Sequence, residues 1–324
     1  MRQNKWYILL LSVLLASCTS APEITLRVHQ CASIPRGRAS ARACALAEKA
    51  YVFGGRDSTG TYLNDLWVYD SATDQWTGLG ATPLEARVNA TMVTDGDKIY
   101  VGLGYAAQKA YVDSAYLKDW WEYTPSTNTW KPLANYPSDN TVAPVTYCIN
   151  HRLYVFYGCG YVQQNEVWQY DPSSDTWSRL PERDNDALRA FGCAGAAING
   201  FAYFGLGFNS HNLRDWYRVT LPDIQWSACS ALPGKGREFS ACAADKDYVY
   251  IFGGRAFGGD MTGGEIFDTY LRYSPEKDQW EWCGTMPCGR AENQIAFTID
   301  GTVYFGLGED ETGTAIDKLY RIEE

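Results

Sequence analysis

The chain has 324 residues with 46% hydrophobic and 15% aromatic side chains, which is enough to bury a large core. Its formal net charge of -10 and its lack of basic runs argue against proteins that bind nucleic acids or anionic lipid surfaces through charge. We therefore expect no nucleic-acid partner.

The N-terminal residues predict export. Arg2 and Lys5 precede an apolar run, residues 6–16, that is too short to span a bilayer as a stable helix. The segment Leu15-Ala16-Ser17-Cys18 resembles a bacterial lipobox, in which the cysteine is lipidated and becomes the first residue. The alternative is ordinary secretory cleavage near Ala21, which the following proline disfavours.

This resemblance implies an exported bacterial lipoprotein that is anchored in the membrane through the lipid on Cys18 alone and faces the periplasm. Without the first 17 residues, 26 basic and 38 acidic residues remain, a formal charge of -12. We expect three segments: a signal peptide at 1–17, a lipid-anchored tether at 18–23 and the folded body at 24–324.

A tyrosine followed four residues later by a glycine occurs six times, at spacings that suit four short strands with turns. The copies are Tyr51/Gly55, Tyr100/Gly104, Tyr154/Gly158, Tyr203/Gly207, Tyr250/Gly254 and Tyr304/Gly308. A tryptophan stands seven residues after a second aromatic or apolar position in five copies: Tyr69/Trp76, Tyr123/Trp130, Tyr170/Trp177, Val219/Trp226 and Tyr273/Trp280.

Glycines that end one strand and a Tyr-Asp-(Pro)-x4-Trp turn resemble kelch repeats over almost the whole chain. The resemblance implies an all-β fold, a six-bladed β-propeller. The sixth copy ends after its third strand, at 317–322, whereas residues 24–35 have the layout of the outer strand at 280–287. We expect the N-terminal strand to complete the last blade and so to pair an open edge.

We name the four strands of a blade a to d, from the axis outward. Tight turns such as Asp95-Gly96 join a to b, and turns such as Asp171-Pro172 join c to d, so both kinds share one face. The b-to-c loops and the d-to-a crossings then meet on the other face, around the opening that we call the mouth.

Arginines recur at two kinds of position that should approach the mouth. Five precede strand a and two follow the repeat glycines: Arg38, Arg87, Arg189, Arg237 and Arg290, then Arg56 and Arg255. In kelch substrate adaptors that recognise acidic peptides, arginines at both kinds of position hold carboxylates. The alternative is that the first kind satisfies neighbouring backbone carbonyls. A positive mouth on an acidic protein favours an anionic ligand.

The b-to-c loops of blades 2 and 5 are the longest. Their rings predict two opposed aromatic walls that suit a sugar acid or an extended peptide: Tyr105, Tyr111 and Tyr116 in one loop, Phe257 and Phe267 in the other. The alternative is that these rings pack only against their own loops.

Catalysis has two precedents among kelch-type propellers. With three histidines, of which at most one is expected at the mouth, the chain lacks a copper site like that of galactose oxidase, and we expect no metal or cofactor. The chain also resembles N-acetylneuraminate epimerases, which implies acid/base candidates at Glu238, Glu292 and Glu309. The glycine-glutamate step of that family is missing from the middle blades and occurs here at Gly308-Glu309.

We therefore expect a monomeric, non-catalytic binding propeller whose partner is an acidic peptide or protein, or an anionic sugar. The alternative is a sugar epimerase or mutarotase.

Nine cysteines besides Cys18 give an odd count, which argues against a complete disulfide framework. Cys31 and Cys44 lie on outer and inner strands, about three spacings of ~4.8 Å apart, which exceeds the reach of a disulfide. Cys283 and Cys288, which flank a turn, form the one plausible bridge.

Overall fold

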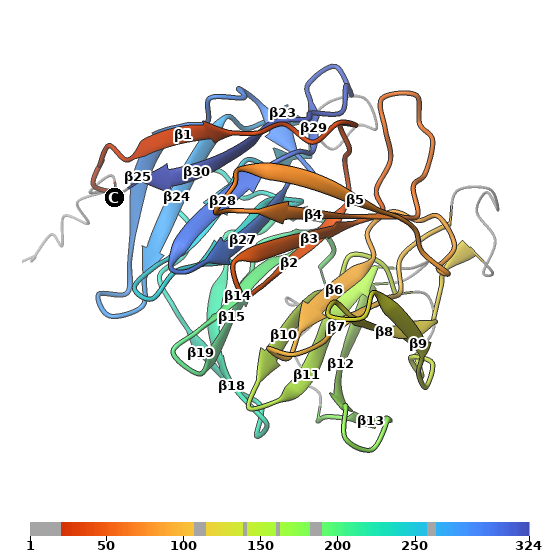
Figure 1. Cartoon of the computed structure of the whole chain (residues 1–324). Coiled ribbons are helices and arrows are strands. Elements are labelled where there is room, and N and C mark those ends of the chain that lie inside the picture. The colour runs from red at the N-terminus through yellow and green to blue at the C-terminus, as the bar shows by residue number, and fades with distance from the viewer. Residues whose placement is uncertain are drawn as a thin grey trace, which may run out of the picture.

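The computed structural model describes residues 21–106, 115–138, 141–159, 163–181, 190–257 and 264–323. Within these ranges the chain forms β-strands and no α-helix, so no helix there is long and apolar enough to cross a membrane. Six four-stranded antiparallel sheets surround a central axis (Figure 1), and their inner strands contact one another in a closed cycle. The predicted six-bladed propeller is confirmed.

Each blade runs outward from the axis in the order a, b, c, d. Blade 1 contains β2 (Arg42–Leu46), β3 (Lys49–Phe53), β4 (Asp65–Asp70) and β5 (Gln75–Ala81). Blade 2 contains β6 (Thr91–Thr94), β7 (Ile99–Gly102), β8 (Trp120–Thr124) and β9 (Thr129–Pro132). Blade 3 contains β10 (Val145–Ile149), β11 (Arg152–Cys159), β12 (Gln163–Asp171) and β13 (Thr176–Arg179).

The second half repeats this order. Blade 4 contains β14 (Ala194–Ile198), β15 (Phe201–Gly205), β18 (Trp216–Thr220) and β19 (Gln225–Ala228). Blade 5 contains β20 (Ala241–Ala244), β21 (Val249–Phe252), β24 (Thr269–Ser274) and β25 (Gln279–Thr285). Blade 6 contains β27 (Ile295–Ile299), β28 (Thr302–Gly306), β30 (Leu319–Glu323) and, outermost, β1 (Arg27–Cys31).

Three short ribbons lie outside the blades, in the connections that form the mouth. They are β16 (Phe208–Asn209) with β17 (His211–Asn212), β22 (Arg255–Ala256) with β23 (Glu265–Ile266), and β26 (Ala291–Glu292) with β29 (Glu309–Asp310).

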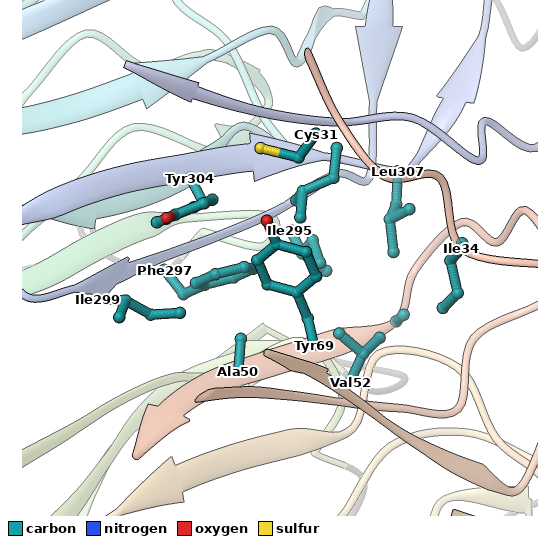
Figure 2. Close-up of a cluster of buried hydrophobic side chains, with 12 residues drawn as sticks. Cys31, Ile34, Ala50, Val52, Tyr69, Ile295, Phe297, Ile299, Tyr304 and Leu307 are labelled. Carbon is teal, nitrogen blue, oxygen red and sulfur yellow. The ribbon is translucent and has the colours of Figure 1, made fainter. Parts of the chain in front are cut away.

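The ring closes as the sequence predicts, because β1 pairs antiparallel with β30 in register Arg27↔Glu323 to Cys31↔Leu319. The segment before β1 also attaches to blade 5, where Ile24 N–H donates to the Trp282 carbonyl (2.8 Å). Cys31 packs with Tyr69 of blade 1 and Tyr304 of blade 6 in one buried cluster (Figure 2). The N-terminal segment therefore joins both sides of the closure.

The Tyr-Trp spacing of the repeat has a physical cause. Tyr69 Oη donates to Asp74 (2.8 Å), which also accepts the backbone N–H of Ala32 (2.8 Å) at the outer edge of the preceding blade. Trp76 Nε1 donates to the Ala32 carbonyl (2.8 Å). We call this set an interblade clasp. It recurs in blade 3 at Tyr170, Asp175 and Trp177 on Ala134, and in blade 5 at Tyr273, Asp278 and Trp280 on Ser230.

A second set of bonds circles the axis just before each inner strand. Backbone N–H groups donate to carbonyls of the adjacent blade at 2.8–3.1 Å: Ser40 to Asn293, Asn293 to Phe239, Phe239 to Gly192, Ala143 to Asn89 and Asn89 to Ser40. These six residues all have φ between 51° and 66°, the left-handed region. We call them the axial ring.

The repeat glycine has no room for a side chain. Gly55 has φ 90°, and a Cβ there would lie 2.6 Å from the Ala39 carbonyl oxygen. The same clash arises at Gly254, whose Cβ would lie 2.6 Å from the Glu238 carbonyl. This close approach lets the chain before strand a pair with the chain after strand b, and this pairing builds the mouth.

Candidate functional site

Equivalent backbone pairs from successive blades form the mouth. In blades 1, 2, 4, 5 and 6, the residue after the repeat glycine pairs with the residue before the axial ring: Ala39 with Arg56, Val88 with Tyr105, Phe191 with Phe208, Glu238 with Arg255, and Glu292 with Glu309. Blades 5, 6 and 1 thus contribute charged pairs or an arginine, whereas blade 4 contributes two phenylalanines. The mouth is therefore charged on the side of blades 5, 6 and 1 and apolar on the side of blade 4.

The charged residues of blades 5, 6 and 1 form an ionic cluster. Arg56 pairs with Glu309, and Arg255 Nε lies 2.9 Å from Glu292 and 3.9 Å from Glu238. The three glutamate side chains are 2–8% exposed, whereas both arginines are 31% exposed. The arginines therefore face the solvent side of buried carboxylates.

Asn293, a member of the axial ring, joins the same cluster through its side-chain amide, which donates to Glu309 Oε1 (3.0 Å). With three carboxyls and two guanidinium groups, the cluster is not the positive mouth that the sequence predicts. Each arginine there is matched by a carboxylate, which corrects that expectation.

Glu238 differs from the other two glutamates. Burial, with a smaller contribution from the nearby Glu292, raises its pKa to about 7 against the opposing effect of Arg255. Its Oε2 is buried and has no hydrogen-bond partner among the described residues. Burial also raises the pKa of Glu292. A carboxyl group that is half-protonated near neutral pH can act as either a proton donor or an acceptor.

Arg38 and Arg87 are completely buried and do not line the mouth. Arg38 makes two bonds to Asp65 (2.8 and 3.1 Å), and Arg87 makes two to Asp119 (2.6 and 2.8 Å). Each also donates to the carbonyl of a strand-end residue, Gly54 or Leu103. The expectation that these two side chains hold a ligand is corrected, since they tie the crossing before strand a to strand c.

Arg237 is 1% exposed, but Thr269 stands where blades 1 and 2 have Asp65 and Asp119. Its guanidinium lies over the ring of Phe267 (4.0 Å to the centroid), which is itself only 8% exposed. Neither residue reaches the opening, so both ligand-binding expectations are corrected.

Arg290 is exposed and pairs with Glu311 (3.3 Å), outside the ionic cluster. Arg189 and Tyr111 lie outside the described residues, as do Cys18 and the predicted signal peptide. Cys283 and Cys288 are free thiols. The described residues contain no group of three or more side chains that could hold a metal ion.

Those aromatic residues of the long loops that the structure describes do not form two opposed walls. Tyr105 packs on Tyr116 at 5.3 Å within one loop, while Phe257 packs on Phe208 of blade 4 at 5.2 Å. Phe208 in turn packs on Phe191 (5.5 Å), which reaches Phe239 of the axial ring (5.9 Å). We call these four phenylalanines the aromatic arc. Phe191, Phe208, Phe239 and Asn293 were not predicted, although Phe208 occupies the same repeat position as Arg56.

Comparisons with known proteins agree with the fold. Residues 19–207 match the KLHDC2/KLHL20/DRC7 Kelch-repeats domain, and residues 236–287 match the Kelch motif. A solved structure titled "Structure of YjhT" superposes with a TM-score of 0.76 over 90% of this chain and 99% of that chain, at 16% sequence identity.

Two kinds of curated relatives are similar in sequence. Kelch-like protein 25 of Xenopus tropicalis is 27% identical over 267 residues, which cover 79% of this chain and 42% of that protein. N-acetylneuraminate epimerase of Shigella flexneri is 31% identical over 144 residues, which cover 39% of this chain and 38% of that protein. The chain thus matches less than half the length of either relative. With the family match extending over more than half of the sequence, the chain belongs to the kelch-repeat family.

Proposed function

We propose that the mouth binds a small sugar acid between the ionic cluster and the aromatic arc. The observation that carries this proposal is the meeting of Arg56 and Arg255, both partly exposed, with three buried carboxyls from blades 5 and 6. The terminal nitrogens of Arg255 have no bond to a described residue, so they can receive a ligand carboxylate. The glutamates can accept hydroxyl donors, and the arc offers an apolar face to a sugar ring.

Calorimetric titration of sialic acid, galacturonate and neutral galactose tests this proposal. We expect the acids to bind more tightly than galactose, and Arg255→Gln to weaken acid binding roughly 10- to 100-fold, the value of a charge-assisted bond. Arg152→Gln is the matched control, because Arg152 pairs with Asp171 in blade 3, remote from the cluster. Equal affinity of wild type and Arg255→Gln would contradict the proposal. Binding of an acidic peptide instead of the sugars would replace it with protein recognition.

A second candidate function is acid/base catalysis of anomer exchange on such a sugar. The unpartnered carboxyl of Glu238 and the 31% identity to an epimerase over part of the chain favour it. Proton NMR of sialic acid with catalytic amounts of protein should then show faster exchange that Glu238→Gln abolishes. An exchange rate equal to that in buffer would leave binding alone.

A further inference from the structure

A cavity of about 170 Å³ lies on the propeller axis, below the axial ring and lined by inner-strand residues of all six blades. Its wall consists of small or neutral side chains, among them Ala43, Met92, Thr146, Cys193, Ser240 and Ala296. Arg42 is the single charged residue that lines it among the described part of the chain.

Arg42 has few partners for a guanidinium group with five donors. Nη1 donates to the Ala41 carbonyl at 3.1 Å and Nη2 to Asn89 Oδ1 at 3.4 Å. No carboxylate in the described ranges lies within 4 Å of it, and its pKa is lowered to about 10 by burial alone, with no acidic group opposing. The side chain thus stays protonated at neutral pH without a counter-ion.

The lack of a carboxylate partner for Arg42 is unusual in comparison with Arg38 and Arg87. Both of those arginines are completely buried and have an aspartate that accepts two bonds, as expected for a cation removed from water, whereas Arg42 is partly exposed where it lines the cavity. The positions equivalent to Arg42, two residues after the axial ring, are uncharged in the other blades: Thr91, Val145, Ala194, Ala241 and Ile295. The charge is therefore not required by the propeller repeat.

We propose that the axial cavity binds a small anion against Arg42. The volume far exceeds the ~10–15 Å³ that a single water needs, so a chloride or a carboxylate fits with some water remaining. Asn89, which already contacts the guanidinium, has side-chain N–H donors that bond to no described residue. A single anion would neutralise the charge, and the uncharged wall would not repel it.

The anion has two possible sources with the same chemistry. It is a free inorganic ion, or it is the carboxylate of a ligand that enters from the mouth past the axial ring. Arg42 lies in β2, outside the ionic cluster, so the free-ion case is independent of the proposed sugar-acid site.

Thermal unfolding at constant ionic strength tests the site, with chloride or acetate compared against gluconate, a larger and more strongly hydrated anion that should bind Arg42 more weakly. We expect chloride and acetate to raise the melting temperature of wild type above its value in gluconate. In gluconate, Arg42→Gln should be at least as stable as wild type, and chloride and acetate should not raise its melting temperature. Arg152→Gln should respond like the wild type. Crystals soaked in bromide should show anomalous density beside Arg42.

Absence of that density, or equal stabilisation of wild type and Arg42→Gln by chloride, would overturn the proposal. Titration of the sugar acid into Arg42→Gln separates the two sources. Unchanged affinity identifies a free anion, whereas lost affinity together with competition by chloride identifies the ligand carboxylate.

Discussion

Glu238 shows how one residue position decides the chemistry of the mouth. Its carboxyl sits beside Arg255 and Glu292, and burial raises its pKa to about 7 from an ordinary value of 4.5. Because the folded protein holds this proton more tightly than the unfolded chain, the stability of wild type should fall as pH rises from about 4.5 to 7. We expect Glu238→Gln to remove up to ~3 kcal/mol of that fall, measured by urea unfolding at pH 5 and pH 7.5.

Glu276→Gln provides the control, since Glu276 is exposed on the c-to-d turn of blade 5. Its pH profile should match that of wild type. A Glu238→Gln profile as steep as that of wild type would show that Glu238 is ionised throughout this range, and would remove the case for its role as a proton donor.

The two kinds of arginine explain how far site prediction from sequence could go. The repeat placed Arg38, Arg56, Arg87 and Arg255 near one face, but their burial depends on residues far away in the chain. Arg38 and Arg87 are buried because each forms an ion pair with an aspartate about 30 residues later in the chain, Asp65 or Asp119. Arg56 meets Glu309 only because the ring closes, a contact across 253 residues that repeat spacing does not specify.

At the scale of a strand and its turn, the interblade clasp connects sequence motif to stability. Asp175 accepts bonds from Tyr170 Oη (2.7 Å) and from the Ala134 N–H of the preceding blade (2.8 Å). Asp175→Ala leaves both donors without an acceptor and should lower the free energy of unfolding by about 2–4 kcal/mol in urea titrations.

Asp175→Asn should cost less than about 1 kcal/mol, because the amide oxygen can still accept both bonds and blade 2 has Asn128 at this position, bonded to Tyr123 (2.9 Å). If the alanine and asparagine variants are equally stable, the clasp adds nothing beyond the packing of Tyr170 against Trp177. Those two rings lie 4.8 Å apart in the structure, and neither substitution changes them.

The architecture of the propeller could be predicted almost completely, because most blades repeat one set of local requirements: a glycine where backbones meet, an acid or amide at the turn and a tryptophan that bonds to the neighbouring blade. Blade 4 departs from the clasp, with Val219 and Ile224 at the tyrosine and aspartate positions, and still forms its four strands. Apolar packing replaces the bonds there, since Val219 is fully buried with Phe156 and Phe204.

Ring closure makes the N-terminal segment the part on which the whole molecule depends. Residues 21–35 supply β1, the Ala32 groups of the blade 1 clasp, and Cys31 and Ile34 of the core in Figure 2. A chain that starts at residue 36 exposes the edge of β30 and should unfold at a temperature at least ~10 °C lower, or self-associate through that edge.

A synthetic peptide of residues 21–35, added in trans, should restore the lost stability, because every contact of the segment is non-covalent. The same peptide with Val28 replaced by proline should fail, since proline cannot donate to the β1–β30 ladder. The prediction is wrong if the truncated chain has the same melting temperature as the full-length protein and neither peptide changes it, because the ring would then close without the N-terminal strand. The pairing of Arg56 with Glu309 across the blade 1–blade 6 junction would then be independent of the strand that completes blade 6.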